Sequence, residues 1–131
     1  EDLVVQAISD ARSIVQMLSR KGKKFSKLTL IVSSAAKWNE LLSALKKDSP
    51  EKASDGITEA VLMEYVEKEF YALQYRLAGQ LKQVDEKQVL EQARQFVEKE
   101  LGLKFSVEAE EKSPHGKASK AMPLKPAIVL E

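Results

Sequence analysis

Apolar residues recur at steps of three and four along four stretches of the chain, which is the spacing of one buried face of a helix. We therefore predict helices over residues 3–20, 35–47, 58–78 and 86–100. The expected inner faces carry Trp38 in the second helix, Val61 and Tyr65 in the third, and Phe96 in the fourth.

The ends of these helices have recognisable capping residues. Ser33 and Ser34 offer hydroxyl oxygens just before the second helix, and Asp85 with Gln88 has the form of a capping box before the fourth. A glycine favours the left-handed conformation that ends many helices. We expect this role for Gly22, Gly79 and Gly102.

Three short segments have the patterns of strands. Residues 28–32 are nearly all apolar, which predicts a strand buried on both faces. Residues 103–109 alternate between apolar and polar, as a half-buried strand does. Residues 127–130 follow two prolines and are expected to form a short strand at a sheet edge. Residues 48–56 form a polar loop, and a flexible basic loop is expected at 111–126.

The order of these elements predicts an α+β fold with α/β-like character. We expect a small mixed three-stranded sheet packed by about four helices, in a single domain over residues 1–131. The first predicted helix starts almost at residue 1, which indicates a piece of a longer protein.

Composition restricts the chemistry of the chain. The sequence has no cysteine, which excludes disulfides and thiolate sites and favours a cytoplasmic location. It has one histidine, His115, in a polar loop, so neither a metal centre nor a catalytic triad is expected. No apolar stretch reaches the roughly 20 residues of a membrane span. We predict no catalytic, cofactor-binding or metal-binding residue in this chain.

The charge is unevenly distributed although its sum is only +1. Residues 11–47 carry nine Lys or Arg and one acid, Glu40, whereas residues 48–111 carry eight bases and fifteen acids. Residues 112–125 then add four lysines and no acid. Such polarity can steer a polyanion to one side of a molecule, although ordinary solvation of the surface explains it equally well.

Two basic segments are candidates for contacts with RNA phosphates. The first joins the first helix to the first strand, and Gly22 and Ser26 are expected to add free backbone N–H groups to it. The second is the basic loop near the carboxyl end, which also includes Lys112 and is expected to order on RNA. The predicted RNA-binding residues are Arg20, Lys21, Lys23, Lys24, Lys27, Lys117, Lys120 and Lys125. Helix capping and an inert, soluble loop are the alternatives.

Two further features have ordinary interpretations. Trp38 could stack on an unpaired base, but it shares an apolar stripe with Leu41 and Leu45, which favours packing in the core. The acidic residues of the third helix lie off its apolar stripe, which favours a solvated face over acid or metal chemistry. They are Glu59, Glu64, Glu67 and Glu69.

The run 121–128, AMPLKPAI, closely resembles the C-terminal signature of archaeal and eukaryotic-type leucyl-tRNA synthetases. The resemblance extends through an opening helix with Ile8 and Ile14, a basic turn, a short strand and a helix containing Trp38. It continues in a later segment formed by Asp85, Leu90, Phe96, Lys99, Glu100, Leu101 and Gly102. Residues 48–82 match the family least.

This resemblance implies a role and partners. Such enzymes join leucine to tRNA with ATP and magnesium, through a class I catalytic domain whose HIGH and KMSKS motifs are absent here. Their C-terminal domain holds the long variable arm of leucine tRNA. The resemblance therefore implies that the chain binds leucine tRNA and the rest of its synthetase. The alternative is a protein-interaction module that docks on a synthetase without touching RNA.

Overall fold

The computed structural model describes residues 2–53, 55, 57–77 and 82–131 of the chain. The chain folds as two units, one formed by Glu1–Ser33 with Asp85–Glu131 and the other by Ser34–Val84. We call them unit 1 and unit 2 and describe each by itself. The expectation of one RNA-binding domain over the whole chain stays a prediction.

Unit 1 is built on a three-stranded sheet with the order β2-β1-β3. The central strand β1 (Lys27–Val32) pairs in parallel with β2 (Lys104–Ala109) and antiparallel with β3 (Ala127–Leu130). The mixed sheet and the position of β3 at an edge confirm the predicted α+β architecture. Because β2 follows β1 by more than 70 residues, the parallel pair requires a long connection.

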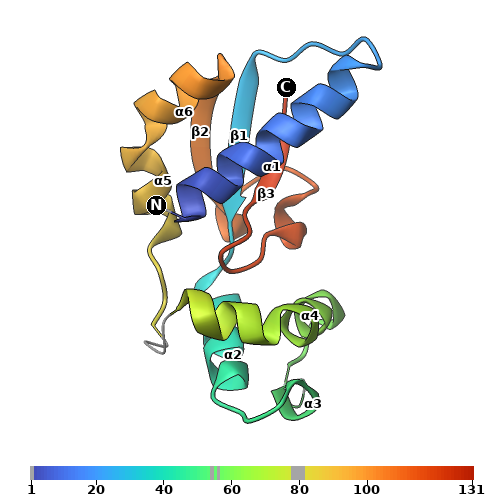
Figure 1. Cartoon of the computed structure of the whole chain (residues 1–131), viewed down its shortest axis with the longest axis vertical. Helices are drawn as coiled ribbons and strands as arrows, with labels where there is room; N and C mark the ends of the chain where they lie inside the picture. Colours follow the sequence, from blue (N-terminus) through green and yellow to red (C-terminus); the bar gives the residue numbers. More distant parts are fainter. Residues whose placement is uncertain (1, 54, 56, 78–81) are drawn as a thin grey trace. The chain divides into compact units, whose positions relative to one another are not determined.

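The two faces of this sheet are covered by different segments. Helices α1 (Asp2–Ser19), α5 (Glu86–Gln92) and α6 (Arg94–Leu101) lie on one face, where α1 runs obliquely across the sheet in Figure 1. Leu28 and Leu30 enter that core at 1% exposure, and each contributes roughly 1.5–3 kcal/mol by burial. On the other face, Ile31 packs against Ala118 and Ala121 of the carboxyl-terminal segment. The prediction that β1 is buried on both faces is therefore confirmed.

The predicted helix over residues 86–100 is wrong in one respect, because it is broken at Ala93. That residue has φ −92° and ψ 7° and separates α5 from α6. The break changes the phase of the apolar stripe, so Val97 is buried while Phe96 is 52% exposed, contrary to the prediction. Both ends match the sequence signals: Asp85 accepts a hydrogen bond from the Gln88 N–H at 3.2 Å, and Gly102 is left-handed with φ +67°.

Unit 2 consists of α2 (Ala35–Leu45), α3 (Pro50–Ala53) and α4 (Ala60–Arg76). The Ser34 hydroxyl caps α2 by accepting from the Lys37 N–H at 3.3 Å, as predicted. Its buried side chains come from all three helices and include the tryptophan. The buried apolar side chains of these helices are Trp38, Leu41, Ala44, Leu45, Ala53, Leu62, Val66, Phe70 and Leu73.

Three predictions for unit 2 need correction. Residues 48–56 are not wholly a loop, since Pro50 has the backbone angle that starts a helix and α3 forms there. The third predicted helix starts at Ala60, because the Thr58 hydroxyl donates to Glu40 at 3.0 Å instead of capping. A kink at Glu69 interrupts its stripe, and Val61 is 60% exposed instead of buried. The predicted stop at Gly79 lies outside the described residues.

Candidate nucleic-acid interface

The connection between α1 and β1 holds the first group of predicted phosphate contacts. After Ser19 the chain turns through Gly22, whose φ of +83° is left-handed, as its sequence position predicts. The expected free N–H groups are a wrong prediction. The Gly22 N–H donates to the Ser19 carbonyl at 2.9 Å, and the Ser26 N–H donates to the Glu131 carbonyl at 2.7 Å. These two N–H groups are therefore not available to phosphates.

The cationic side chains of this connection are all exposed, and within the described part of the chain none of them forms an ion pair. They are Arg20, Lys21, Lys23, Lys24 and Lys27, which we call the turn cluster. The parallel register also places exposed Lys104 of β2 beside Lys27. No local pattern shows this neighbour, because it depends on which strands pair and in what register.

The carboxyl-terminal segment, residues 110–126, is held in place by a buried turn. Met122 and Lys125 exchange two backbone hydrogen bonds, with N···O distances of 3.0 and 2.8 Å. Leu124 between them has φ +64°, a conformation that costs a non-glycine residue about 1–2 kcal/mol. The Leu124 N–H donates to the buried carboxylate of Glu86 at the start of α5. The segment thus has defined turns and an anchor, and its expected flexibility stays a prediction.

Three lysines of this segment converge on one groove. Lys117, Lys120 and Lys125 line a groove of about 450 Å³ together with Asp10, Ser13 and Ile14 of α1. We call these three lysines the groove cluster. All three are exposed, and no ion pair joins any of them to another described residue. Lys112, the fourth lysine of the segment, does not line this groove.

The two clusters lie at opposite ends of the edge strand β3. Lys27 is bonded to the Glu131 carbonyl just after β3, whereas Ala127, the first residue of β3, lines the groove. Four residues of extended chain separate them, which corresponds to about 13 Å. The predicted contacts therefore form two groups, both on unit 1.

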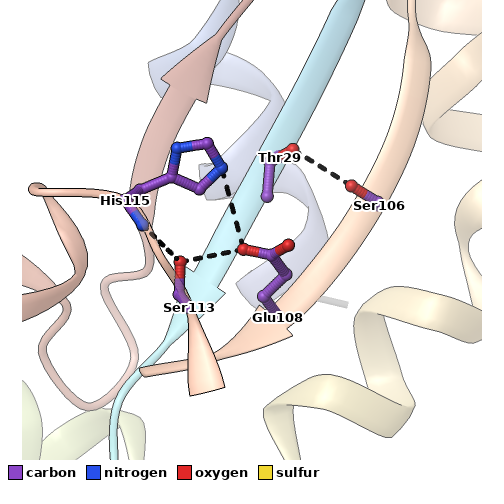
Figure 2. A network of polar contacts seen from close by, with 5 residues as sticks. All are labelled: Thr29, Ser106, Glu108, Ser113 and His115. Carbon is purple, nitrogen blue, oxygen red and sulfur yellow. Dashed lines mark hydrogen bonds and ion pairs between the residues drawn. The ribbon is translucent and has the colours of Figure 1, made fainter. Parts of the chain in front are cut away.

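Figure 2 shows how polar residues tie this segment to the sheet. Ser113 donates to Glu108 Oε1 at 2.8 Å, and the His115 ring faces the same oxygen, with Nε2 3.8 Å away. The His115 backbone N–H donates to the Ser113 hydroxyl at 3.3 Å. The ring thus faces the carboxylate and not the hydroxyl, so these residues do not form the hydrogen-bond chain of an activated serine. They fasten the segment to β2.

The remaining candidates have structural explanations. Trp38 is 1% exposed and packs in unit 2, so it is a core residue, as favoured, and has no free face for a base. Glu59, Glu64 and Glu67 are exposed, which agrees with a solvated face, whereas Glu69 at the kink of α4 is half-buried. No group of three potential metal ligands occurs among the residues that the structure describes. No described helix is long and apolar enough to cross a membrane.

Unit 1 therefore carries two groups of exposed cationic side chains, and comparison with known proteins gives the class of protein that the chain resembles. The chain is similar to ligases that act on tRNA. It is 29% identical to the leucine–tRNA ligase of Pyrococcus abyssi, 28% to that of Pyrococcus furiosus and 23% to that of Pyrococcus horikoshii. Each alignment covers 100% of this chain but only 14% of the relative.

These matches confirm the resemblance inferred from the terminal run: over its whole length the chain is similar to a part of archaeal leucine–tRNA ligases that makes up 14% of each enzyme. No protein-family model matches the chain. No solved structure matches it either.

Proposed function

We propose that this chain is a tRNA-binding domain of a leucine–tRNA ligase and that it contacts the long variable arm of leucine tRNA. In this role it supports ATP-dependent leucylation that other parts of the enzyme carry out, and it has no catalytic residue of its own. The same proposal includes a cytoplasmic location and the remainder of the synthetase as a partner. It also includes ATP and magnesium as cofactors of the parent enzyme.

The observation that carries the proposal is a set of exposed cations on unit 1 that form no ion pair with another residue of the described part of the chain. The turn and groove clusters together place eight exposed Lys or Arg side chains at the two ends of β3, with Lys104 beside them. Over the whole units, unit 1 carries 14 Lys or Arg against 12 Asp or Glu, and unit 2 carries seven against eight. Cations without carboxylate partners are available to replace the counterions of phosphates, which is the main source of affinity for nucleic acid. We therefore assign the RNA contact to unit 1.

The salt dependence of binding tests this assignment. Binding of the chain to a tRNA with a long variable arm should weaken steeply as salt rises. The K23Q/K24Q variant should reduce the slope of log K against log salt by about 1.4–1.8, since each phosphate contact contributes about 0.7–0.9. K46Q/K47Q is a matched control, because Lys46 and Lys47 are an exposed lysine pair on unit 2.

The two variants separate the possible outcomes. Equal slopes for both, with unchanged circular dichroism, would show that Lys23 and Lys24 do not contact RNA. Absence of salt-dependent binding by the unmodified chain would refute the proposed function itself.

One observation favours a second function for unit 2. Tyr71 and Tyr75 lie one turn apart on α4 and are 65% and 85% exposed. Exposed tyrosines are enriched at protein–protein interfaces. We propose docking of this face on a protein, with the synthetase as the first candidate. Salt-independent binding to such a partner, lost in Y71A/Y75A, would support it.

A further inference from the structure

The outer face of α4 in unit 2 carries a pair of exposed aromatic rings. Tyr71 and Tyr75 lie four residues apart, so their side chains are neighbours on one face of the helix. They are 65% and 85% exposed, whereas Phe70 and Leu73 beside them are buried. The Tyr71 ring stands edge-on to the Phe70 ring, with the two centroids 5.1 Å apart. A core residue of unit 2 therefore supports the Tyr71 ring at the surface.

The polar ends of these rings are also free to bind. Neither tyrosine hydroxyl forms a hydrogen bond with another residue that the structure describes. A tyrosine at an interface buries a large ring that has only two side-chain torsions, so it loses little conformational entropy on binding. Its hydroxyl can then form a hydrogen bond with the partner. The two side chains therefore have the properties of contact residues.

The charges of α4 disfavour RNA as the partner of this face, although tyrosines also stack on unpaired bases. The helix and its N-cap carry two bases and four acids, which are Lys68, Arg76, Glu59, Glu64, Glu67 and Glu69. Glu64 and Glu67 form no ion pair with a residue of the described part of the chain. Phosphates would therefore meet net negative charge on this helix, unlike at the turn and groove clusters.

The size of the aromatic pair favours a partner on the same polypeptide. An aromatic side chain buries roughly 150–250 Å², so at 65% and 85% exposure the two rings together offer about 300 Å². A stable complex of separate proteins buries about 800 Å² on each partner. A tethered partner needs less area, because the tether gives an effective concentration on the order of 1 mM. The relatives extend far beyond the chain, which covers 14% of their length.

We propose that the face formed by Tyr71 and Tyr75 docks reversibly on another part of its own polypeptide, the parent synthetase. The proposal rests on the second function proposed above, because it requires that this face meets a protein. It adds that the contact is intramolecular. Such docking limits the positions that the domain can take in the enzyme without adding a catalytic group.

Hydroxyl-radical footprinting of the full-length enzyme and of the isolated chain tests the proposal without any substitution. A contact with a dissociation constant of about 0.1 mM would be formed about 90% of the time at an effective concentration on the order of 1 mM. The oxidation rates of Tyr71 and Tyr75 should therefore be about tenfold lower in the enzyme than in the isolated chain. Met17 and Phe96 on unit 1 are internal controls, since they are 53% and 52% exposed, and their rates should be similar in both proteins.

Two outcomes of the footprint would overturn the proposal directly. Equal oxidation of the two tyrosines in the enzyme and in the isolated chain would show that no part of the enzyme covers them. Equal protection of the tyrosines and Phe96 would show that the enzyme covers the whole chain and not this face.

Dilution and added tRNA identify the partner. Docking within one polypeptide is independent of concentration, so the protection should persist through about a hundredfold dilution of the enzyme. Protection that is lost on dilution would assign the face to a second copy or a separate protein and overturn the proposal. Protection that appears only with tRNA, in the isolated chain as well, would assign it to RNA and also overturn the proposal.

Failure of the proposed functions gives different results. If the chain shows no salt-dependent binding to tRNA, the RNA-binding function is refuted while the footprint still supports docking. If a separate protein binds the chain and loses affinity for Y71A/Y75A, but the tyrosines of the enzyme alone are unprotected, docking on a protein stands and the intramolecular partner is wrong.

Variants of the full-length enzyme provide a second readout, the radius of gyration from small-angle X-ray scattering. Y71A/Y75A should increase it, because an undocked domain reaches more distant positions. Y71F/Y75F keeps both rings and should not increase it. M17A/F96A is the matched control, because it removes two exposed side chains from unit 1, and it should leave the radius unchanged. Equal radii for the unmodified enzyme and Y71A/Y75A would overturn the proposal.

Discussion

The buried carboxylate of Glu86 offers a sharp test of how unit 1 is held together. Glu86 is 3% exposed at the start of α5, and its Oε1 accepts the N–H of Leu124, which lies 38 residues away in the chain. The bond anchors the turn between Met122 and Lys125. We therefore expect E86A to destabilise unit 1.

The expected size of the effect follows from this geometry. A hydrogen bond to a charged group contributes about 1.5–3 kcal/mol, and its loss in E86A leaves the Leu124 N–H buried without an acceptor. Removal of a buried charge also relieves a desolvation cost, which offsets part of the loss. We expect a net decrease in the free energy of unfolding of about 2 kcal/mol. E86Q keeps an acceptor oxygen and should lose less than about 1 kcal/mol.

Urea unfolding followed by circular dichroism measures this change. With a slope of about 2 kcal/mol per molar urea, the midpoint for E86A should fall by about 1 M. E91A is the control, because Glu91 is exposed on the same helix, and it should stay within about 0.5 kcal/mol of the unmodified chain. If E86A unfolds at the same midpoint as E91A, the Glu86–Leu124 bond does not stabilise the fold.

Two further predictions concern the backbone and the core. G102A should lower the free energy of unfolding by about 1 kcal/mol, because residue 102 has φ +67°. An added Cβ would meet no atom within 4 Å, so only backbone strain opposes the substitution. An unchanged urea midpoint would contradict this prediction. The fluorescence of Trp38, which is 1% exposed, should resist quenching by acrylamide in the folded chain and become fully sensitive to acrylamide in urea. Strong quenching in the folded chain would place the Trp38 ring at the surface.

The sequence predicts the fold where the signal is local and repeated. The stripe of α1, the caps at Ser34 and Asp85 and the left-handed Gly22 and Gly102 all occur as predicted. Each of these features is decided within a few residues. The break at Ala93 and the kink at Glu69 could not be predicted from a few neighbouring residues. Both residue types are compatible with a continuous helix, and packing determines the interruption.

The candidate site is only partly predictable for a related reason. Runs of lysine show where charge is concentrated, but they do not show that Lys104 lies beside Lys27 or that Asp10 and Ile14 line the same groove as Lys120. Those neighbours depend on the parallel register of β1 with β2 and on the path of residues 110–126 beside α1. No pattern in one sequence reports such long-range pairing.

The run AMPLKPAI contributes both to the stability of the fold and to the lining of the groove. Its first four residues, Ala121 to Leu124, are buried and form the anchored turn, and residues 126–128 form the apolar lining of the groove. Lys125 is its only charge, while Lys117 and Lys120 lie outside it on a separate turn.

Stability and charge are therefore separable in this segment. Changes in the buried turn should lower unfolding free energy and RNA affinity together, because a displaced turn also moves Lys125. Changes at Lys117 or Lys120 should lower the salt slope alone, since both side chains are exposed and unpaired among the described residues. A K117Q/K120Q variant that lost stability instead of salt dependence would show that these lysines stabilise the fold and do not contact RNA.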